Sequence, residues 1–443
     1  MKLVNEPCVQ VGIMTAPAVF LMLRGDYRCG GELVSGAVEV LLSESGKLCW
    51  RGAEHEELDF EPVSVDATFD VDNVTIGVNF HWERRETQRF SGSIRLLSGT
   101  EGVTVVNVIG VESYLLSVIS SEMSANASAS LLRAHAVISR SWLLAQMRST
   151  RHLVQPSDAA CTDGCTACEN EVVKWYDRDD HDRFDVCADD HCQRYQGILR
   201  QTTSAVADAV AATRGQVLMS GAYLCDARFS KCCGGAMELF ENCWEPVNHP
   251  YLQARRDSAE PDALPDLTVE DNARQWILGT PEAYCNTSDP AVLSQVLNDY
   301  DRETADFYRW TVEYGQDQLS ELLLRRSGID FGRIIDLRPL ARGSSGRIYR
   351  LEICGTLRTV TVGKELEIRK WLSESHLYSS AFIVERCDVG ADGIPARFVI
   401  RGAGWGHGVG LCQIGAAVMG ARGIAYDRIL SHYFPGSSLY TLY

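Results

Sequence analysis

The first hundred residues alternate between apolar and polar positions over short stretches. Val, Leu and Gly dominate, and the alternation is clearest at 37–42, 67–71 and 92–97. A period of two turns one face of each segment toward a core and the other toward water, which is the pattern of a β-strand. We therefore expect an N-terminal β-rich domain over residues 1–105.

From residue 111 the period lengthens to that of a helix. Apolar residues recur at Val111, Tyr114, Leu115, Val118 and Ile119. This spacing is typical of an amphipathic helix. A second helix, capped by Ser128 or Ser130, has the stripe Leu131, Ala134, Ile138, Trp142 and Ala145. The two stripes predict that these helices pack on each other.

The rest of the chain mixes helices, strands and acidic loops. Residues 156–192 carry eleven acidic residues, three basic ones and five Cys without periodicity. A third helix is expected from near Ser204 to before Gly215, strands at 347–362 and 397–401, and a last helix at 426–434. The prediction is an α+β fold in which a helical catalytic region packs on β-rich parts. Its segments are 1–105, 106–254, an acidic, partly helical insertion at 255–310, and 311–443.

Composition narrows the class of partner. The 443 residues are 45% hydrophobic and 23% charged, as in ordinary globular proteins, and their net charge is −17. Nucleic acid and anionic membranes attract basic surfaces, so neither is expected as a broad partner. No apolar run reaches the 18 or so residues of a membrane span. The N-terminal residues lack the order of a secretory signal, so we expect a chain that begins mature or stays inside the cell.

Glu122 is the most informative single residue. It lies three and four positions after Ile119 and Val118, so it continues the apolar stripe of the first helix. Burial would raise the pKa of this carboxyl and keep it protonated near neutral pH, as a general acid requires. The alternative is that the helix has frayed at this point and the side chain is solvated.

A second carboxylate for glycoside hydrolysis is missing from this helix. Hydrolases of glycosides use two carboxylates about 5 to 9.5 Å apart. Glu112 is ten residues earlier, which places it about 15 Å away along the helix. The pattern therefore offers one placed carboxylate, and any partner must come from elsewhere in the fold.

Cysteine and histidine spacing predicts a metal site. His181, Cys187, His191 and Cys192 give H-x5-C-x3-H-C, a complete ligand set for one tetrahedral, structural Zn²⁺. The surrounding loop is too polar to fold by burial, so a metal would supply its order. Unliganded surface residues are the alternative.

The other cysteines give weaker signals. Cys161, Cys165 and Cys168 have the C-x3-C-x2-C spacing of radical S-adenosylmethionine enzymes, but they lie in an acidic loop without a β/α repeat. A second metal site or free thiols fit better. Cys232 and Cys233 are interpreted as buried structural thiols, since no spacing places His249 or His407 beside them.

Two further positions have a structural and a functional interpretation. His135 shares a face with Leu131 and Ile138, so we expect a core residue rather than a ligand or base. The segment 402–410 alternates Gly with other residues and would let its backbone approach a ligand, with His407 and Gln413 as the polar groups displayed. A tight structural turn is the alternative for this segment.

Several of these stretches resemble one bacterial cell-wall family, that of stage II sporulation protein D and the amidase enhancers. The resemblance covers most of the chain from about 106 to 440. It is carried by VESYLLSVISSEMS, LLRAHAVISRSWLLA, DVCADDHCQRYQG, FSKCCGGAMELFENCW and GAGWGHGVGLCQIGAAVMG. The Gly-His-Gly loop followed by Gln413 is the most specific of these matches.

The resemblance implies a lytic transglycosylase. Such an enzyme cleaves the β-1,4 bond between N-acetylmuramic acid and N-acetylglucosamine in peptidoglycan, preferably on strands without stem peptides, and leaves 1,6-anhydromuramyl ends. It implies Glu122 as the catalytic residue and a zinc ion on His181, Cys187, His191 and Cys192. Positions expected around the substrate are Arg140, Gly234, Gly235, Glu238, His407 and Gln413.

The chain also departs from the family pattern. Cys232 and Cys233 replace small hydroxyl residues, His135 replaces Gln, and Cys412 replaces Ser. The expected location is the cell envelope because the polymer lies there, or the cytoplasm if the protein acts on turnover fragments. The alternative function is a non-catalytic protein that binds peptidoglycan and recruits or stimulates an amidase.

Overall fold

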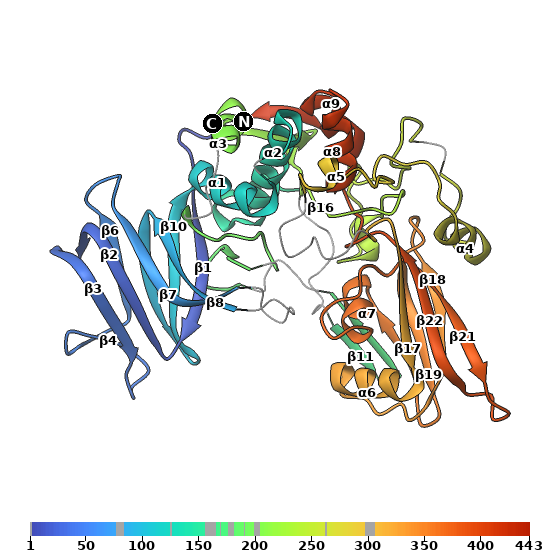
Figure 1. The fold of residues 1–443 in the computed structure, drawn as a ribbon. Helices are drawn as coiled ribbons and strands as arrows, with labels where there is room; N and C mark the ends of the chain where they lie inside the picture. The colour runs from blue at the N-terminus through green and yellow to red at the C-terminus, as the bar shows by residue number, and fades with distance from the viewer. Residues whose placement is uncertain are drawn as a thin grey trace. The chain divides into compact units, whose positions relative to one another are not determined.

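The computed structural model of this chain describes residues 2–76, 84–124, 126–155, 165–168, 170–175, 181–189, 191–198, 204–261, 264–296 and 306–443. The chain divides into two compact units (Figure 1). The first unit comprises 1–154, 181–226 and 439–443, and the second comprises 155–180 and 227–438.

Strands fill the N-terminal part of the first unit, as the alternating pattern predicts. They are β1 (Cys8–Ala16), β2 (Ala18–Cys29), β3 (Glu32–Leu42), β4 (Leu48–Trp50), β5 (Ala53–His55), β6 (Glu57–Pro62), β7 (Thr68–Ile76), β8 (Arg84–Ser91), β9 (Ser93–Gly99) and β10 (Gly102–Gly110). All pairings among them are antiparallel, in the order β1-β10-β9-β6-β2-β3-β4-β5, and β7 pairs with β2 and β8. In β2, Val19 and Leu21 are buried whereas Phe20 is 46% exposed, so one face of the strand forms the core.

Three helices belong to the first unit, and the first of them begins directly after β10. They are α1 (Val111–Glu122), α2 (Ala129–Gln146) and α3 (Ser204–Ala212). The predicted stripes of α1 and α2 are buried, and Ser128 caps α2 by accepting a hydrogen bond from Leu131 N–H at 3.2 Å. Glu6 satisfies a backbone N–H in the first turn of α1, since its Oε1 accepts a hydrogen bond from Glu112 N–H at 3.0 Å.

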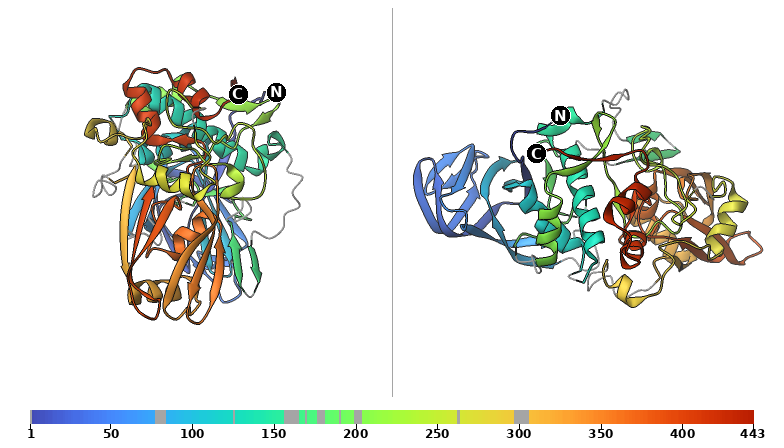
Figure 2. Two further views of the ribbon diagram at one scale, coloured as in Figure 1. Left: turned by 90° about the vertical axis from the view of Figure 1, so that its right-hand side faces the viewer. Right: turned by 90° about the horizontal axis from the view of Figure 1, so that it is seen from above.

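The expected domain boundary near residue 105 is not a boundary between units. β10 ends at Gly110, α1 begins at Val111, and α1 packs on β1 and β10 (Figures 1 and 2). The chain ends also belong to this unit: Leu3 N–H donates to Leu442 O at 2.7 Å, and Leu442 N–H donates to Gly215 O at 2.8 Å. A short sheet is formed there by β14 (Gln216–Ser220), β15 (Tyr223–Leu224) and β24 (Ser438–Thr441).

The second unit contains two sheets, and two of its helices connect strands of one sheet to strands of the other along the chain. One sheet contains β11 (Cys165–Cys168), β12 (Glu171–Lys174), β20 (Thr359–Gly363), β19 (Ile348–Gly355) and β18 (Ile334–Arg342), and the parallel pair β12–β20 joins its two parts. The other contains β17 (Arg309–Gly315), β22 (Pro395–Ala403) and β21 (Phe382–Val389). Their core is completed by apolar residues of α6 (Gln316–Ser327) and α7 (Glu365–Trp371), such as Leu323 and Ile368.

The acidic insertion is part of the second unit and is partly helical, as expected. It contains α4 (Glu270–Leu278) and α5 (Pro290–Leu293). Trp276 on α4 packs with Leu267 and Ala236, so the insertion shares a core with the segment before it. The unit is completed by β16 (Phe229–Ser230), β23 (Leu411–Cys412), α8 (Gln413–Ala421) and α9 (Tyr426–Tyr433).

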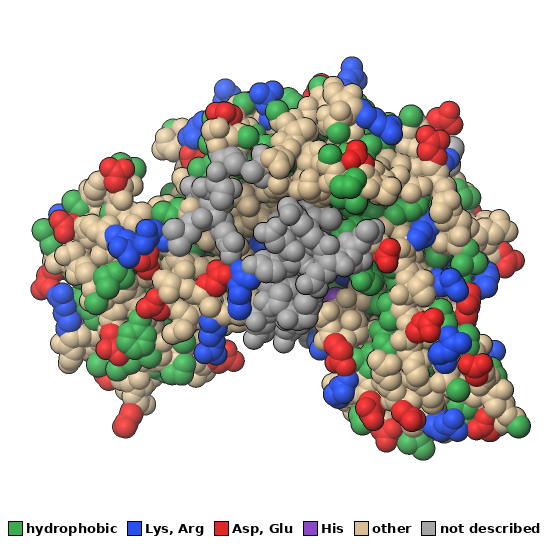
Figure 3. Space-filling view, viewed as in Figure 1, with side chains coloured by type: hydrophobic (Ala, Val, Ile, Leu, Met, Phe, Trp, Pro, Cys, Tyr) green, Lys and Arg blue, Asp and Glu red, His purple; other side chains and the backbone are tan. Residues whose placement is uncertain are grey.

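The surface carries charges of both signs. On the face drawn in Figure 3, acidic and basic side chains are interspersed rather than gathered into one field. Within the described residues, no helix combines the length and the apolar character needed to cross a bilayer. The α+β class predicted from the sequence is confirmed by these elements.

Candidate functional site

Glu122 is the last residue of α1, and its side chain is half-buried. Val118 and Ile119, one turn earlier, are fully buried, so the carboxylate continues the buried stripe. Met123 ends the helix with an extended backbone, and its N–H donates to Ile119 O at 2.8 Å. The carboxylate therefore lies on a well-formed helix end rather than in a frayed segment.

The four residues predicted to bind metal come together in the first unit. The ligand atoms of His181, Cys187, His191 and Cys192 lie within 4.8 Å of one another. Cys192 Sγ is 3.4 Å from His181 Nε2 and 3.5 Å from His191 Nδ1. Atoms bound to one tetrahedral ion at about 2.0 to 2.3 Å have similar separations. These residues, which we call the first metal site, can therefore hold a single ion.

The electrostatics of the first metal site favour a thiolate. Contacts with Cys192 and with the imidazoles of His181 and His191 lower the pKa of Cys187 well below its usual range, although burial opposes this shift. A thiolate is the form of cysteine that binds metal. β13 (Val186–Cys187) also pairs with β1, which holds Cys187 in place.

The segment after the first metal site packs on both helices. Gln196 N–H donates to Ser117 Oγ on α1 at 3.2 Å, and Gln193 Nε2 donates to the Ser139 carbonyl on α2 at 3.4 Å. An ion that orders the loop would therefore also fix the segment that is braced against the helix ending at Glu122.

The pKa of Tyr114 is influenced both by the first metal site and by Glu122. Burial raises the pKa of Tyr114 well above its usual range, and the negative charges of Cys192, Cys187 and Glu122 add to the shift. The Tyr114 ring stacks on Tyr195 with ring centroids 5.0 Å apart. The neutral Tyr114 phenol on α1 is therefore close enough to interact electrostatically with both the Glu122 carboxylate and the thiols of the first metal site.

Arg140, expected beside the substrate, belongs to the core instead. Its side chain is fully buried, and Nε and Nη2 donate to Glu112 Oε1 and Oε2 at 2.9 and 2.6 Å. Nη1 donates to the Gln216 carbonyl at 3.0 Å. A guanidinium used in this way has no surface for a substrate, so we assign Arg140 to the packing of α1, α2 and β14.

Glu238 is likewise an internal residue. It is fully buried, and its Oε1 accepts from Leu239 N–H and Asn242 Nδ2 at 2.8 Å. Oε2 accepts from the Ser345 hydroxyl at 2.6 Å and from Ser345 N–H at 3.2 Å. These donors stabilise the charged carboxylate, which links the segment 238–242 to the loop at Ser345. The carboxylate is therefore unavailable as a second catalytic acid.

The Gly-rich loop packs against protein backbone rather than exposing its own. Gly404 and Gly234 have φ of +77° and +75°, and a Cβ on Gly404 would lie 2.7 Å from Cys232 O. Cys232 and Trp405 exchange two backbone hydrogen bonds of 3.0 and 2.7 Å. The adjacent Gly235, with φ of +99°, approaches side chains instead: an added Cβ would lie 2.9 Å from the Tyr308 hydroxyl. The structure thus favours the tight-turn interpretation for both glycine segments.

His407 and Gln413 flank this loop. His407 is half-buried, its Nδ1 accepts from Val409 N–H at 3.0 Å, and its ring meets Trp244 with centroids 4.8 Å apart. Burial, with the charges of Arg228 and Arg347 nearby, lowers the pKa of His407 well below its usual range, so the imidazole is neutral at physiological pH. Gln413 is 2% exposed at the start of α8. Glu122 and this pair belong to different units.

The expectations for the other Cys and His residues have mixed outcomes. His135 is a buried core residue whose Nδ1 lies 3.0 Å from Ser139 Oγ, as predicted. Cys161 lies outside the described residues, and only the backbone of Cys165 and Cys168 is described, in β11. Cys232 and Cys233 are buried as expected.

Sequence reasoning missed the surroundings of Cys233. Its thiol contacts Asp257 and Cys285, and Cys412 lies in the same cluster. Cys233 and Cys412 are 179 positions apart, so this cluster could not be predicted from local spacing in the sequence.

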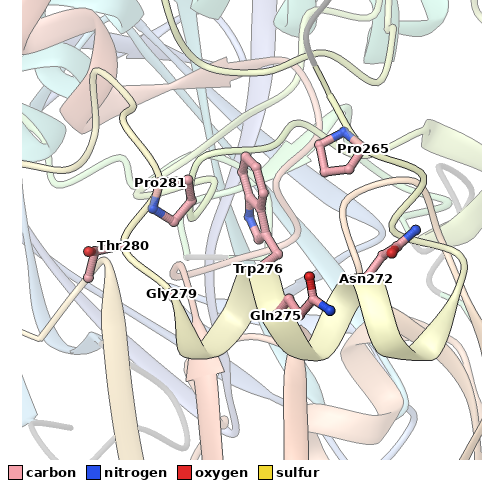
Figure 4. Close-up of a pocket in the computed structure, with 7 residues that line it drawn as sticks. All are labelled: Pro265, Asn272, Gln275, Trp276, Gly279, Thr280 and Pro281. Carbon is pink, nitrogen blue, oxygen red and sulfur yellow. The ribbon is translucent and has the colours of Figure 1, made fainter.

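A pocket of about 280 Å³ lies on the acidic insertion of the second unit (Figure 4). Its lining residues are Pro265, Asn272, Gln275, Trp276, Gly279, Thr280 and Pro281. The Trp276 ring stands between the two prolines in this view. None of the site residues expected from the sequence lines this pocket.

Comparison with known proteins gives two family matches, each to part of the chain. Residues 99–220 match the family described as Stage II sporulation protein. Residues 238–410 match a Domain of unknown function (DUF8618). The first match contains α1, α2, Glu122 and the first metal site.

The chain is also similar to the Amidase enhancer of Bacillus subtilis (strain 168), with 25% identity over 248 residues. The alignment covers 52% of this chain and 32% of the relative, so the chain spans about a third of the length of this curated relative. With the match over residues 99–220, this similarity relates the chain, through the part that contains α1 and α2, to the family of Stage II sporulation protein and the amidase enhancers.

Proposed function

We propose that this protein is a peptidoglycan lytic transglycosylase that cleaves the β-1,4 bond between N-acetylmuramic acid and N-acetylglucosamine. The observation that carries the proposal is the half-buried Glu122 at the end of α1. The family similarity supports a role on peptidoglycan. The substrate proposed here is a glycan strand that lacks stem peptides.

Glu122 would act twice in this reaction. As an acid it protonates the glycosidic oxygen, which leaves as the 4-hydroxyl of N-acetylglucosamine. As a base it then removes the proton of the muramyl C6 hydroxyl, which attacks C1 and closes a 1,6-anhydro ring. The carboxyl is protonated again at the end. The reaction therefore consumes no water and needs no second carboxylate.

The first metal site would bind zinc in a structural role. Two imidazoles and two thiolates fill a tetrahedral shell, which leaves no open position for substrate. Zinc suits this donor set because thiolate and imidazole are among its preferred ligands. Its contribution would be to order residues 181–196, and so to hold the segment that packs on α1 and α2.

The product formed in isotopically heavy water tests the proposed reaction. Digestion of stripped glycan strands in ¹⁸O water is expected to give 1,6-anhydromuramyl ends without label, because the attacking oxygen belongs to the sugar. Mass spectrometry of the fragments measures this directly. Labelled reducing ends would show hydrolysis and would refute the single-carboxylate reaction.

The second candidate function is a non-catalytic peptidoglycan-binding protein that enhances an amidase. The printed name of the Bacillus subtilis relative, Amidase enhancer, favours it. If stripped and intact strands both remain uncut, while the chain sediments with peptidoglycan and raises the rate of an added amidase, this function replaces the first.

Removal of the first metal site is expected to disorder its loop. Protein purified without chelator should carry zinc at this site, and the Cys187→Ser/Cys192→Ser variant should lose that ion because two of four ligands are gone. Native mass spectrometry gives the count, and limited proteolysis should cut the variant within 181–196 at least tenfold faster. Cys49→Ser, a half-buried thiol in β4, is the control. An unchanged ion count in the double variant would contradict the assignment.

The proposed place of action is the cell envelope, where intact peptidoglycan lies. Action on turnover fragments inside the cell is the alternative. Fractionation of cells that produce the protein, with detection of this chain in envelope and cytoplasmic fractions, distinguishes the two.

A further inference from the structure

We propose that the second unit binds a second metal ion, buried in its core, through Cys233, Asp257, Cys285 and Cys412. We call these residues the second metal site. They come from four separate segments: the turn after β16, two loops that begin and interrupt the acidic insertion, and the end of β23. This proposal is independent of the reaction at Glu122.

The spacing of the donor atoms fits one ion. One ligand atom from each of the four residues lies within 4.8 Å of the others. Cys233 Sγ is 3.5 Å from Cys285 Sγ and 3.5 Å from Asp257 Oδ2. These separations match those of the first metal site, where Cys192 Sγ is 3.4 Å from His181 Nε2. Bonds of about 2.0 to 2.3 Å from a central zinc would span them.

Burial makes a cation the natural companion of this cluster. Asp257 and Cys412 are 0% exposed, and Cys285 and Cys233 are 1% and 2% exposed. An ionised carboxylate in such a place is costly unless a positive charge or several donors compensate it. Within the described residues, Asp257 contacts the Tyr433 hydroxyl, Cys285 N–H, the Cys233 thiol and the His432 imidazole. None of these groups carries a permanent positive charge.

The donors are also held in place before any ion binds. Cys285 N–H donates to Asp257 Oδ2 at 3.1 Å, and Cys233 N–H donates to Cys412 Sγ at 3.2 Å. A Cβ on Gly415 of α8 would lie 2.6 Å from Asp257 Oδ2, so the carboxylate is pressed against the backbone of that helix. Backbone N–H groups that point at sulfur and oxygen stabilise the anionic forms that a metal requires.

Three thiolates and one carboxylate favour zinc over other ions. Soft thiolates select zinc and iron, whereas magnesium and calcium prefer oxygen. A [4Fe–4S] cluster would bind each thiolate to a different iron and hold the sulfur atoms further apart than here. Cys232, whose thiol contacts Cys285 and Cys412, adds a fourth sulfur beside the ion. Four protein ligands without solvent access indicate a structural ion that ties the insertion to α8.

Native mass spectrometry of the full chain, purified without chelator and supplied with Zn²⁺, tests the proposal. Two ions per chain are expected. Cys285→Ser/Cys412→Ser should retain only the ion of the first metal site, and Cys187→Ser/Cys192→Ser only that of the second. Cys354→Ser, a buried thiol of β19 in the same unit, should keep both ions.

Cobalt substitution covers the case in which the Cys285→Ser/Cys412→Ser chain fails to fold. Wild-type protein loaded with Co²⁺ should show sulfur-to-cobalt charge transfer from five thiolates per chain, three at the second site and two at the first. Intensity for two thiolates, one ion per wild-type chain, or an intact mass reduced by a Cys233–Cys285 disulfide would each overturn the proposal. None of these measurements depends on cleavage of peptidoglycan.

Discussion

Replacing Glu122 by Gln is expected to abolish the formation of 1,6-anhydromuramyl ends, with kcat lower by about 10³-fold. Gln has nearly the same shape as Glu but has no proton to give to the glycosidic oxygen and no charge to accept one from the C6 hydroxyl. Both steps of the proposed reaction depend on this carboxyl, so the loss should be in kcat rather than in KM. Digestion of stripped glycan strands, with products separated and weighed, provides the measurement.

The matched control is Glu101→Gln, an exposed residue in the turn between β9 and β10 of the same unit. It should retain wild-type activity, and both variants should have the wild-type circular dichroism spectrum and melting temperature. Retained cleavage in Glu122→Gln would require another acid. Glu238 is a poor choice for that role because four donors to its two oxygens, including the Ser345 hydroxyl, already fix it in the core.

Local features of the fold were predictable from the sequence because they depend on neighbouring residues. The apolar stripe of α1, the cap at Ser128 and the helices near Ser204 and Tyr426 all follow from spacings of three to eight positions. The first metal site was predictable for the same reason, since its four ligands lie within twelve residues. A short loop can bring such ligands together with little loss of chain entropy.

Features that depend on long-range packing were not predictable. Arg140 is on the inward face of α2, but only the approach of Glu112 and Gln216 reveals that its guanidinium is fully used. The glycines at 404 and 234 signal close approach, yet the sequence does not say whether a ligand or another backbone approaches. The second metal site shares this property, since its ligands are spread from Cys233 to Cys412.

The division of the chain into two compact units was also not predictable from the sequence. A change of hydrophobic period at residue 111 suggests a boundary, but the sheet and helices on either side share one core. Likewise, the prolines and acidic residues of the insertion suggest a separate segment, whereas Trp276 anchors it to Leu267 and Ala236. Period and composition describe each element, and they carry no information about which elements pack together.

Replacing Arg140 by Met is expected to lower the free energy of unfolding by about 3 to 5 kcal/mol, because it leaves Glu112 buried without its cation. Although burial opposes ionisation, Arg140, the Tyr443 hydroxyl and Gly215 N–H hold the pKa of Glu112 below its usual range. This carboxylate therefore stabilises the fold above the unfolded-state pKa of about 4.3, and its contribution is lost as the pH falls through the lower folded value. The deficit of the variant should accordingly be largest near pH 7 and shrink in acid.

Urea denaturation at pH 7 and pH 4 measures this deficit, with Arg133→Met on the exposed face of α2 as the control, expected within about 0.5 kcal/mol of wild type. Adding Glu112→Gln to Arg140→Met should recover most of the stability, because a neutral amide can still accept from Gly215 N–H and Tyr443 without a buried charge. If Arg140 serves only the core, this double variant also recovers cleavage. A double variant that is stable but inactive would instead return Arg140 to the substrate, and would require a second arrangement of α2 in which the guanidinium leaves Glu112.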